Sequence, residues 1–201
     1  AGKVIFQNRM MQLIQYQPTT EQTYERPLLV VPPWINKYYI MDLTPEHSMI
    51  KWLVAQGHTV FVISWVNPDA SYAETGFDDY VLDGLITAVD QVRRATGAEQ
   101  VNPPGYWIGG TLLATSLAYL KSQGNTDIQS ATFLATLLDF SDPGEISVFT
   151  DEEQINSLER RMAQKGFMEG DDMAAAFNLL RAKDLIWSFF INNYLLGNDP
   201  K

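Results

Sequence analysis

The pattern with the clearest chemical meaning in this chain is the run Gly105-Tyr106-Trp107-Ile108-Gly109. Its glycines have the spacing of a nucleophile elbow, a sharp turn that carries a nucleophilic side chain from a strand into a helix. Glycine is needed on both sides because the turn brings backbone segments too close together for a Cβ atom. The central residue should be Ser or Cys, and Trp107 has no nucleophilic atom. The spacing therefore indicates a fold that handles esters or thioesters, while the side chain at 107 argues against catalysis by that route.

The composition suits a soluble globular protein and argues against several functions. Hydrophobic residues make up 46% of the 201 residues and charged residues 19%, a balance that suits one domain with a substantial core. The net charge of −10 argues against a nucleic-acid partner, which would favour a basic surface. The sequence has no cysteine, which excludes disulfides and thiolate metal sites. It has only two histidines, too few to favour a His-rich metal centre. Because no apolar run is long enough for a transmembrane segment and the first residues lack a secretion signal, we expect a cytoplasmic protein.

The elements that must position the elbow alternate along the chain. Apolar or β-branched runs predict strands at 27–32, 59–65 and 130–138, and a further strand must lead into the elbow. Apolar spacing and stop signals predict helices at 44–56, 77–96 and 111–120. In the first of these helices Thr44 is the predicted N-cap and Pro45 the first helical residue. The alternation predicts an α/β fold with a parallel sheet and flanking helices.

The pattern of strands stops after Asp139. The remaining sequence predicts acidic turns and helices at 151–164, 171–180 and 184–195. In an α/β-hydrolase-like fold, helices at this point would form a cap over the active site. We therefore divide the chain into an incomplete α/β-hydrolase core at 1–140 and the start of a helical cap region at 141–201.

Ten strings, in order along nearly the whole chain, resemble the class I polyhydroxyalkanoate synthases, which make polyesters such as poly-3-hydroxybutyrate. They are residues 6–8 (FQN), 11–16 (MQLIQY), 31–40 (VPPWINKYYI), 42–43 (DL), 56–61 (QGHTVF), 64–69 (SWVNPD), 109–115 (GGTLLAT), 137–140 (LLDF), 180–187 (LRAKDLIW) and 192–197 (NNYLLG). The resemblance implies an acyltransferase that polymerises 3-hydroxyacyl-CoA thioesters and releases CoA. It also implies an elbow cysteine, activated by a His that an Asp orients, and no cofactor.

The sequence departs from this family in ways that bear on activity. Trp107 stands where the nucleophilic cysteine is expected, and the triad Asp and His are expected beyond Lys201. Pro103 and Pro104 occupy the strand that enters the elbow, where proline is disfavoured because it cannot donate a ladder hydrogen bond. We therefore expect an incomplete piece of a synthase that is inactive as written.

The other candidate site residues either contribute backbone N–H groups or are less favoured candidates for a catalytic side chain. The N–H groups of Ile108, just after the elbow, and Ile35, after the first core strand, are the predicted oxyanion hole, although both could be ordinary apolar residues at loop edges. His58 lies where strands begin, which favours a structural role, and His47 is expected on the surface early in a helix. Asp139 remains a minor candidate for a catalytic acid.

Two further functions remain open from the sequence. One is a non-catalytic paralogue that binds the synthase or the polyester granule, which Trp107 favours. The other is a generic α/β-hydrolase such as an esterase or depolymerase, in which the elbow should carry Ser. The resemblance further implies 3-hydroxyacyl-CoA and the polyester granule as partners, a homodimer, and a cytoplasmic location, with the granule surface as one possible place.

Overall fold

The computed structural model describes the chain except at residues 1, 36, 143, 145–150, 169–185 and 200–201. The chain forms two compact units, one of residues 1–67 and 75–138, the other of residues 68–74 and 139–201. The predicted division into a core at 1–140 and a cap at 141–201 stays a prediction.

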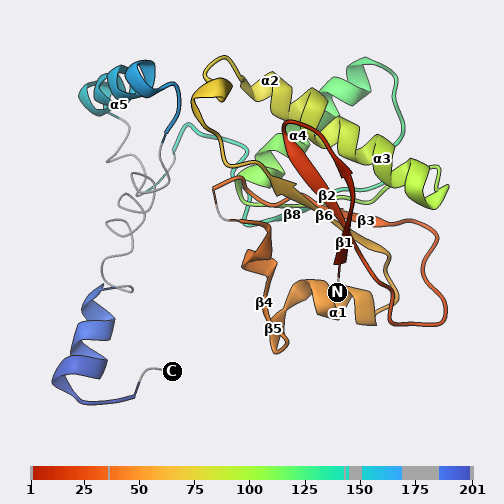
Figure 1. Ribbon diagram of the computed structural model, residues 1–201, viewed down its shortest axis with the longest axis horizontal. Coiled ribbons are helices and arrows are strands. Elements are labelled where there is room, and N and C mark those ends of the chain that lie inside the picture. The colour runs from red at the N-terminus through yellow and green to blue at the C-terminus, as the bar shows by residue number, and fades with distance from the viewer. Residues whose placement is uncertain (1, 36, 143, 145–150, 169–185, 200–201) are drawn as a thin grey trace. The chain divides into compact units, whose positions relative to one another are not determined.

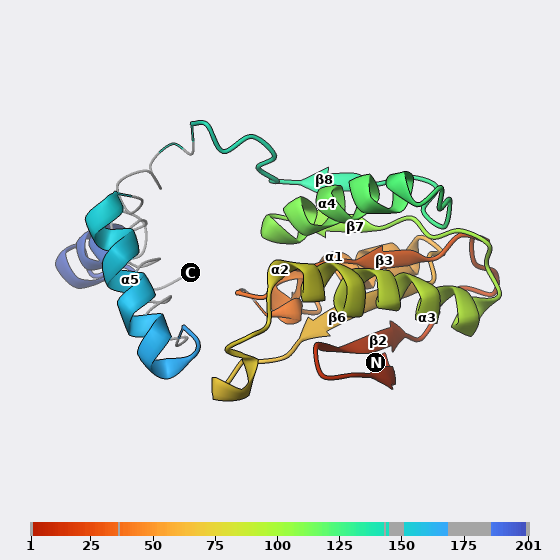
Figure 2. The same ribbon diagram turned by 90° about the horizontal axis from the view of Figure 1, so that it is seen from above.

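The first unit contains a mixed sheet (Figures 1 and 2). Its strands are β1 (Gly2–Gln7), β2 (Met11–Tyr16), β3 (Leu28–Val30), β6 (Val60–Trp65), β7 (Pro104–Tyr106) and β8 (Thr132–Leu134). The first four strands pair in the order β1-β2-β6-β3, and β7 pairs with β8. Parallel bridges from Leu28 to Asn102 and from Val31 to Gly105 place β7 beside β3. The strands β6, β3, β7 and β8 therefore run parallel, and the elbow lies at their carboxyl ends.

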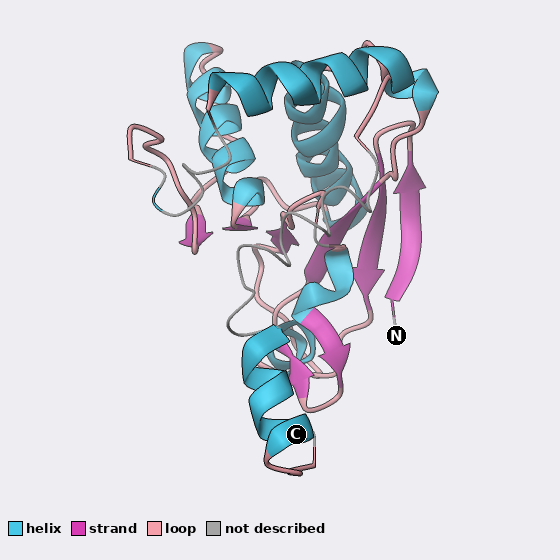
Figure 3. Ribbon diagram, turned by 90° about the vertical axis from the view of Figure 1, so that its left-hand side faces the viewer, coloured by secondary structure: helices cyan, strands magenta, loops and turns pink. Residues whose placement is uncertain are grey.

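The antiparallel part of the sheet is the N-terminal hairpin of β1 and β2, which sequence analysis did not predict. Figure 3 shows it at the edge of the sheet where the N-terminus lies. Its turn is built by Asn8, whose Oδ1 accepts hydrogen bonds from the N–H groups of Met10 and Met11, both at 2.9 Å. An Asx-type turn of this kind reverses the chain locally, and the apolar side of β2 then packs into the core.

Helices of the first unit lie on both faces of the sheet (Figure 1). On one face, α1 (Met49–Ala55) packs Ile50, Leu53 and Val54 against buried valines of β3 and β6. On the other face lie α4 (Ile108–Ser122) and the continuous helical segment formed by α2 (Phe77–Asp79), the π-helical η3 (Tyr80–Ile86) and α3 (Thr87–Thr96). As predicted, this second segment ends at Gly97, which has a φ of 73°.

The predicted helix at 44–56 begins later than expected. Residues of β4 (Asp42–Thr44) pair with β5 (His47–Ser48) instead, and α1 starts at Met49 with Ser48 as its N-cap. The hydroxyl oxygen of Ser48 accepts a hydrogen bond from the N–H of Lys51 at 2.8 Å. Thr44 closes the intervening turn, because its hydroxyl oxygen accepts a hydrogen bond from the N–H of His47 at 3.2 Å. The predicted N-cap at Thr44 is therefore wrong, because the pairing of β4 with β5 delays the start of the helix to Met49.

The strand predicted at 130–138 is also shorter, since β8 ends at Leu134. Ala135, the next residue, has a φ of 48°, which is incompatible with a continuing strand.

The second unit is mainly helical. The short helix η2 (Ala70–Tyr72) is capped by Asp69, and α5 (Glu152–Lys165) is capped by Asp151, whose side chain accepts a hydrogen bond from the N–H of Gln154. The predicted helix at 151–164 is thus confirmed. Residues 186–195 are helical, within the helix predicted at 184–195, and include the π-helical η6 (Phe190–Leu195), whereas the helix predicted at 171–180 lies outside the described residues.

Candidate functional site

The strand-to-helix turn predicted from the glycines is present and unusually tight. A single residue, Trp107, joins the end of β7 at Tyr106 to the start of α4 at Ile108. Its backbone has a φ of 52° and a ψ of −123°. For a residue with a bulky side chain such a conformation costs on the order of 1–3 kcal/mol and persists only where the surroundings impose it.

The surroundings that impose this turn are three glycines with no space for a side chain. A Cβ on Gly105 would lie 2.6 Å from the Cα of Gly110, and one on Gly109 would lie 2.2 Å from the carbonyl oxygen of Val31. A Cβ on Gly110 would lie 2.0 Å from Oγ1 of Thr136. Gly105 and Gly109 are the glycines expected from the sequence, and Gly110 is a further residue on which the turn depends. The adjacent glycine pair in the sequence was the available signal for it.

The two prolines before the turn do not disrupt the strand, contrary to the interpretation from sequence. Pro104 is the first residue of β7, and its carbonyl oxygen accepts a hydrogen bond from the N–H of Val31 at 2.9 Å. The carbonyl oxygen of Pro103 accepts one from the N–H of Thr132 at 3.2 Å. Each proline therefore takes part in pairing through its acceptor, which the ring leaves intact.

The first turn of α4 presents backbone donors beside the elbow. The carbonyl oxygen of Trp107 accepts a hydrogen bond from the N–H of Gly110 at 2.9 Å. At the N-cap position, the side chain of Trp107 makes no capping hydrogen bond to the helix. Ile108 is the first residue of the helix, so its N–H has no acceptor within the helix. A donor in this position can stabilise negative charge on an oxygen of a bound acyl group.

The loop after β3 lies against the same helix end. Gly109 lies so close to Val31 and Pro32 that the end of β3 is next to α4. Ile35, the second predicted oxyanion donor, lies three residues beyond Pro32 in a half-buried bend. The carbonyl oxygen of Pro32 accepts a buried hydrogen bond from Nε1 of Trp65 at 2.8 Å. Trp65 is a residue that sequence analysis did not select, although a tryptophan inside a buried strand needs an acceptor for its N–H.

The structure places neither histidine at the elbow. His58 precedes β6, at the edge where the parallel strands begin, and its ring packs against Tyr24 with centroids 4.8 Å apart. The elbow follows β7 at the opposite edge. His47 is exposed as expected, but it lies in β5 and not in a helix.

Asp139 has the environment of a solvated turn residue. Its carboxylate accepts a hydrogen bond from the backbone N–H of Ser141 at 2.9 Å. That hydrogen bond lowers the pKa of Asp139 below its usual value, so the carboxylate remains ionised at neutral pH. Neither histidine is among its hydrogen-bond partners in the described part of the chain.

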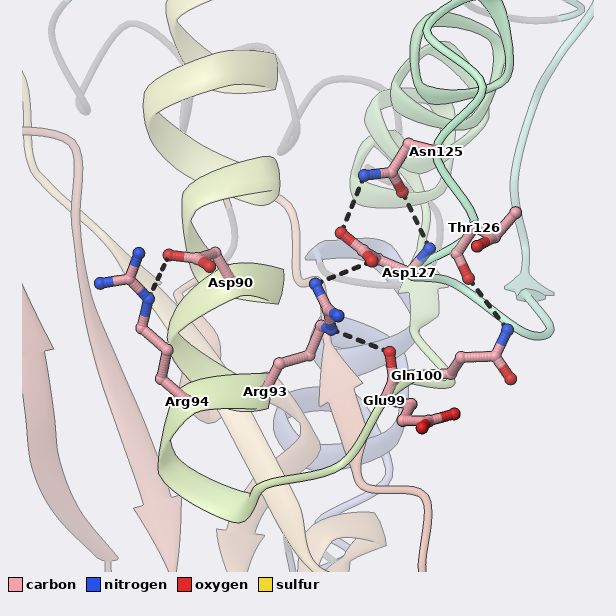
Figure 4. Close-up of polar contacts among 8 residues, drawn as sticks. All are labelled: Asp90, Arg93, Arg94, Glu99, Gln100, Asn125, Thr126 and Asp127. Atoms are coloured by element: carbon pink, nitrogen blue, oxygen red, sulfur yellow. Dashed lines mark hydrogen bonds and ion pairs between the residues drawn. The ribbon is translucent and has the colours of Figure 1, made fainter.

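A polar network lies at the edge of the sheet opposite the elbow (Figure 4). Arg93, near the end of α3, forms an ion pair with Asp127 at 2.7 Å and donates from Nε to the carbonyl oxygen of Glu99 at 2.8 Å. Nearby, Gln100 donates to the carbonyl oxygen of Thr126 at 2.9 Å. These contacts tie the end of α3 to the loops that enter β7 and β8, and so help to fix the strands that carry the elbow.

Comparison with known proteins identifies relatives that match almost the whole chain. Residues 1–53 match the family described as the N-terminus of poly-beta-hydroxybutyrate polymerase (PhaC). A poly(3-hydroxyalkanoate) polymerase of Methylorubrum extorquens is 55% identical over 199 residues, which is 99% of this chain and 33% of that protein. The polymerase subunit PhaC of Cupriavidus necator is 44% identical over 204 residues, covering 99% of this chain and 35% of that subunit.

The chain belongs to the poly(3-hydroxyalkanoate) polymerase family. It spans about a third of the length of the curated relatives that it matches. The resemblance stated from the ordered strings is thereby confirmed.

One solved structure supports the fold class. A double mutant of the esterase rPPE matches with a TM-score of 0.52 at 13% identity, over 75% of this chain and 48% of that chain. The predicted α/β-hydrolase fold is thus confirmed, with the antiparallel hairpin as an addition. Among the described residues, no helix combines the length and apolar character that crossing a bilayer requires, and no three potential ligands of the His, Cys, Asp or Glu type gather around a metal site.

Proposed function

We propose that this chain is part of the catalytic domain of an acyltransferase that polymerises 3-hydroxyacyl-CoA into polyester and releases CoA. The observation that carries the proposal is the identity of 55% across almost the whole chain to a poly(3-hydroxyalkanoate) polymerase. The strained one-residue turn at Trp107 supports it, since a nucleophile in such a turn stands clear of the sheet and can attack an acyl carbon.

The residues of the turn then have distinct roles. Position 107 is that of the nucleophile, where a cysteine thiolate would take the acyl group from CoA. The N–H groups of Ile108 and Ile35 would bind the oxyanion of the tetrahedral intermediate. Gly105 and Gly109 permit the turn by leaving room for backbone.

The chain as written is proposed to be inactive. Trp107 supplies no nucleophile, and the His and Asp of the triad are assigned to the part of the relatives that this chain does not span. Acyl transfer of this kind needs no prosthetic group, because CoA arrives and leaves with the substrate. Homodimerisation and a place at the surface of cytoplasmic polyester granules complete the proposal.

A second candidate function is a non-catalytic protein that binds the synthase or the granule. The specific observation in its favour is Trp107 itself, which fills the position of the nucleophile. A generic esterase or depolymerase fits less well, because relatives 55% and 52% identical over almost the whole chain are named as polymerases.

The test uses a chimera in which this chain replaces the matching 199 residues of the Methylorubrum extorquens polymerase. CoA release from 3-hydroxybutyryl-CoA is measured with Trp107 and with Trp107→Cys, and the folded fraction of each is checked by circular dichroism. We expect release only with Cys, and no release from the isolated chain carrying Trp107→Cys.

The other outcomes discriminate among the alternatives. Silence of both folded chimeras would favour the binding function. Release with Trp107 in place would show that the chemistry does not occur at the elbow, and turnover by the isolated Cys variant would show that the triad has been misplaced.

A further inference from the structure

The hydrogen bond between Trp65 and Pro32 joins two strand ends at the carboxyl edge of the sheet. Trp65 is the last residue of β6, and the residue is only 8% exposed. Its Nε1 donates to the carbonyl oxygen of Pro32 at 2.8 Å, across 33 residues of sequence. A buried carbonyl group that loses its donor carries a desolvation cost, so this contact restricts the orientation of the peptide group after Pro32.

The segment before Pro32 is held equally firmly from the other side. The N–H of Val31 donates to the carbonyl oxygen of Pro104 at 2.9 Å, and the carbonyl oxygen of Val31 accepts from the N–H of Tyr106 at 3.0 Å. Pro32 also lies against Gly109, where an added Cβ would come within 2.9 Å of its carbonyl group. The chain thus leaves β3 in a direction fixed by β7, α4 and Trp65 together.

The residue before Ile35 packs on the same tryptophan. The ring of Trp34 meets that of Trp65 edge-on at 6.3 Å between centroids, and meets Tyr80 at 4.7 Å. Tyr80 in turn lies 5.3 Å from Trp65. Gly84 leaves the space for this arrangement, because a Cβ there would lie 2.7 Å from the indole ring of Trp65. Trp65 therefore anchors the loop twice, through its N–H at Pro32 and through its ring at Trp34.

We propose that Trp65 is a positioning residue that sets the direction of the Ile35 N–H toward the elbow. The inference rests on the proposed function, in which Ile35 is an oxyanion donor. Pro32 and Pro33 have restricted φ angles, so fixing one carbonyl group and one ring leaves the backbone at Ile35 little freedom. A donor that stabilises developing charge must be in place before the reaction, and a displacement of about 1 Å can cost about a hundredfold in rate.

The first arm of the test needs no catalysis. Trp65→Phe keeps an aromatic ring but removes the N–H, and the exposed Trp52→Phe is the matched control. In the 15N-labelled chain we expect the backbone order parameters of Trp34 and Ile35 to fall from about 0.85 to below about 0.6 in Trp65→Phe alone. Those of β6 and α4 should be unchanged, whereas a general loss of stability would affect all of them.

A second replacement guards against misfolding of that variant. Benzothienylalanine at position 65 has nearly the shape of tryptophan with sulfur in place of N–H, so it removes the donor without removing the ring. The same loss of order at Ile35 is expected. Unchanged order parameters and amide shifts at Ile35 in this protein would overturn the inference.

The second arm measures catalysis in the chimera with Cys at 107. Trp65→Phe should lower kcat by about ten- to a hundredfold with KM within about threefold, because the donor is displaced and the substrate still binds. Trp52→Phe should change neither constant. If the chimera with Cys at 107 and Trp65 intact is inactive, the proposed function is refuted, and the order parameters at Ile35 alone then test whether Trp65 fixes this loop. If the chimera is active and Trp65→Phe leaves kcat unchanged, only the inference about Trp65 is refuted.

Discussion

At the scale of single residues, the shape of the candidate site depends on three glycine positions that have no room for a side chain. The elbow can exist because Gly105, Gly109 and Gly110 each face backbone or side-chain atoms at distances no Cβ can occupy. The strained residue between them, Trp107, is the one position where the sequence departs from what the turn ordinarily carries. The geometry for an exposed nucleophile is thus retained although the nucleophile is absent.

Gly109→Ala should be strongly destabilising. The added Cβ would clash with the carbonyl oxygen of Val31, a backbone atom that cannot rotate away as the end of a flexible side chain could. We expect a loss of about 3 kcal/mol in the free energy of unfolding, measured with urea. Gly124→Ala is the control, since Gly124 has a φ of 68° but open space around it, and should cost about 1 kcal/mol. Equal losses for the two variants would contradict the steric explanation.

Tyr16 should make the protein less stable at alkaline pH. Burial raises the pKa of its hydroxyl above the usual value of 10.0, and the hydrogen bond to Asp42 at 2.8 Å raises it further. The folded state therefore holds this proton above pH 10 while the unfolded state releases it, so stability is retained below pH 10 and falls as the pH rises beyond it. The slope for one proton is at most about 1.4 kcal/mol per pH unit.

Tyr16→Phe should remove this part of the slope, whereas Phe in place of the exposed Tyr119 should leave it unchanged. Urea unfolding between pH 9 and 11 measures the difference. The same alkaline slope in Tyr16→Phe as in the unchanged chain would refute the assignment.

At the scale of elements, the parallel strands are held in place by contacts at both edges. The carboxyl edge carries the elbow, and the opposite edge carries the network around Arg93 and Asp127 (Figure 4). Two arginines of α3 form ion pairs, but only Arg93 bonds to residues distant in the sequence, because Arg94 pairs with Asp90 one turn away. The two should therefore contribute differently to stability.

Arg93→Lys should lower the free energy of unfolding by about 1 kcal/mol. A lysine keeps the charge, but its single nitrogen cannot take the positions of both Nε, which donates to the carbonyl oxygen of Glu99, and Nη1, which pairs with Asp127. Arg94→Lys, on the exposed pair, should change it by less than about 0.5 kcal/mol. Thermal and urea unfolding of the two variants provide the comparison, and a larger effect at Arg94 would contradict the assigned role of the network.

At the scale of the whole molecule, the described end of the chain exposes many apolar side chains. Eight of them are at least 42% exposed: Ile186, Trp187, Phe189, Phe190, Ile191, Tyr194, Leu195 and Leu196. An apolar surface of this kind favours association in water. The net charge of −10 opposes association but is spread over the whole sequence.

We expect the chain to self-associate as its concentration rises. Its apparent mass in analytical ultracentrifugation should then exceed the monomer mass of 22.7 kDa. The double variant Phe189→Ser with Leu195→Ser should shift the distribution toward the monomer. Trp52→Ser, which removes an exposed aromatic side chain from α1, should not. Identical concentration dependence for the double variant and the unchanged chain would exclude these side chains as the cause.

The sequence by itself determined the family, the α/β class and the place of the elbow, because these depend on local signals. Glycine spacing marks a close approach of backbone wherever it occurs, and ordered strings identify relatives without any structure. Strands β3 and β6 follow from apolar runs, β7 follows from the elbow that it must enter, and the helices after them follow from apolar spacing and stop signals. Gly97, with its φ of 73°, ends a helix where the sequence placed the end.

The tertiary structure alone decided what depends on partners far apart in the chain. It placed the N-cap at Ser48 and not at Thr44 because β4 pairs with β5. It also accommodated Pro103 and Pro104 at the start of β7, because their carbonyl oxygens accept hydrogen bonds from the neighbouring chain segments. It also joined Trp65 to Pro32 across 33 residues. Such contacts have no local signature, since a hydrogen bond between distant segments is set by the packing of the whole sheet.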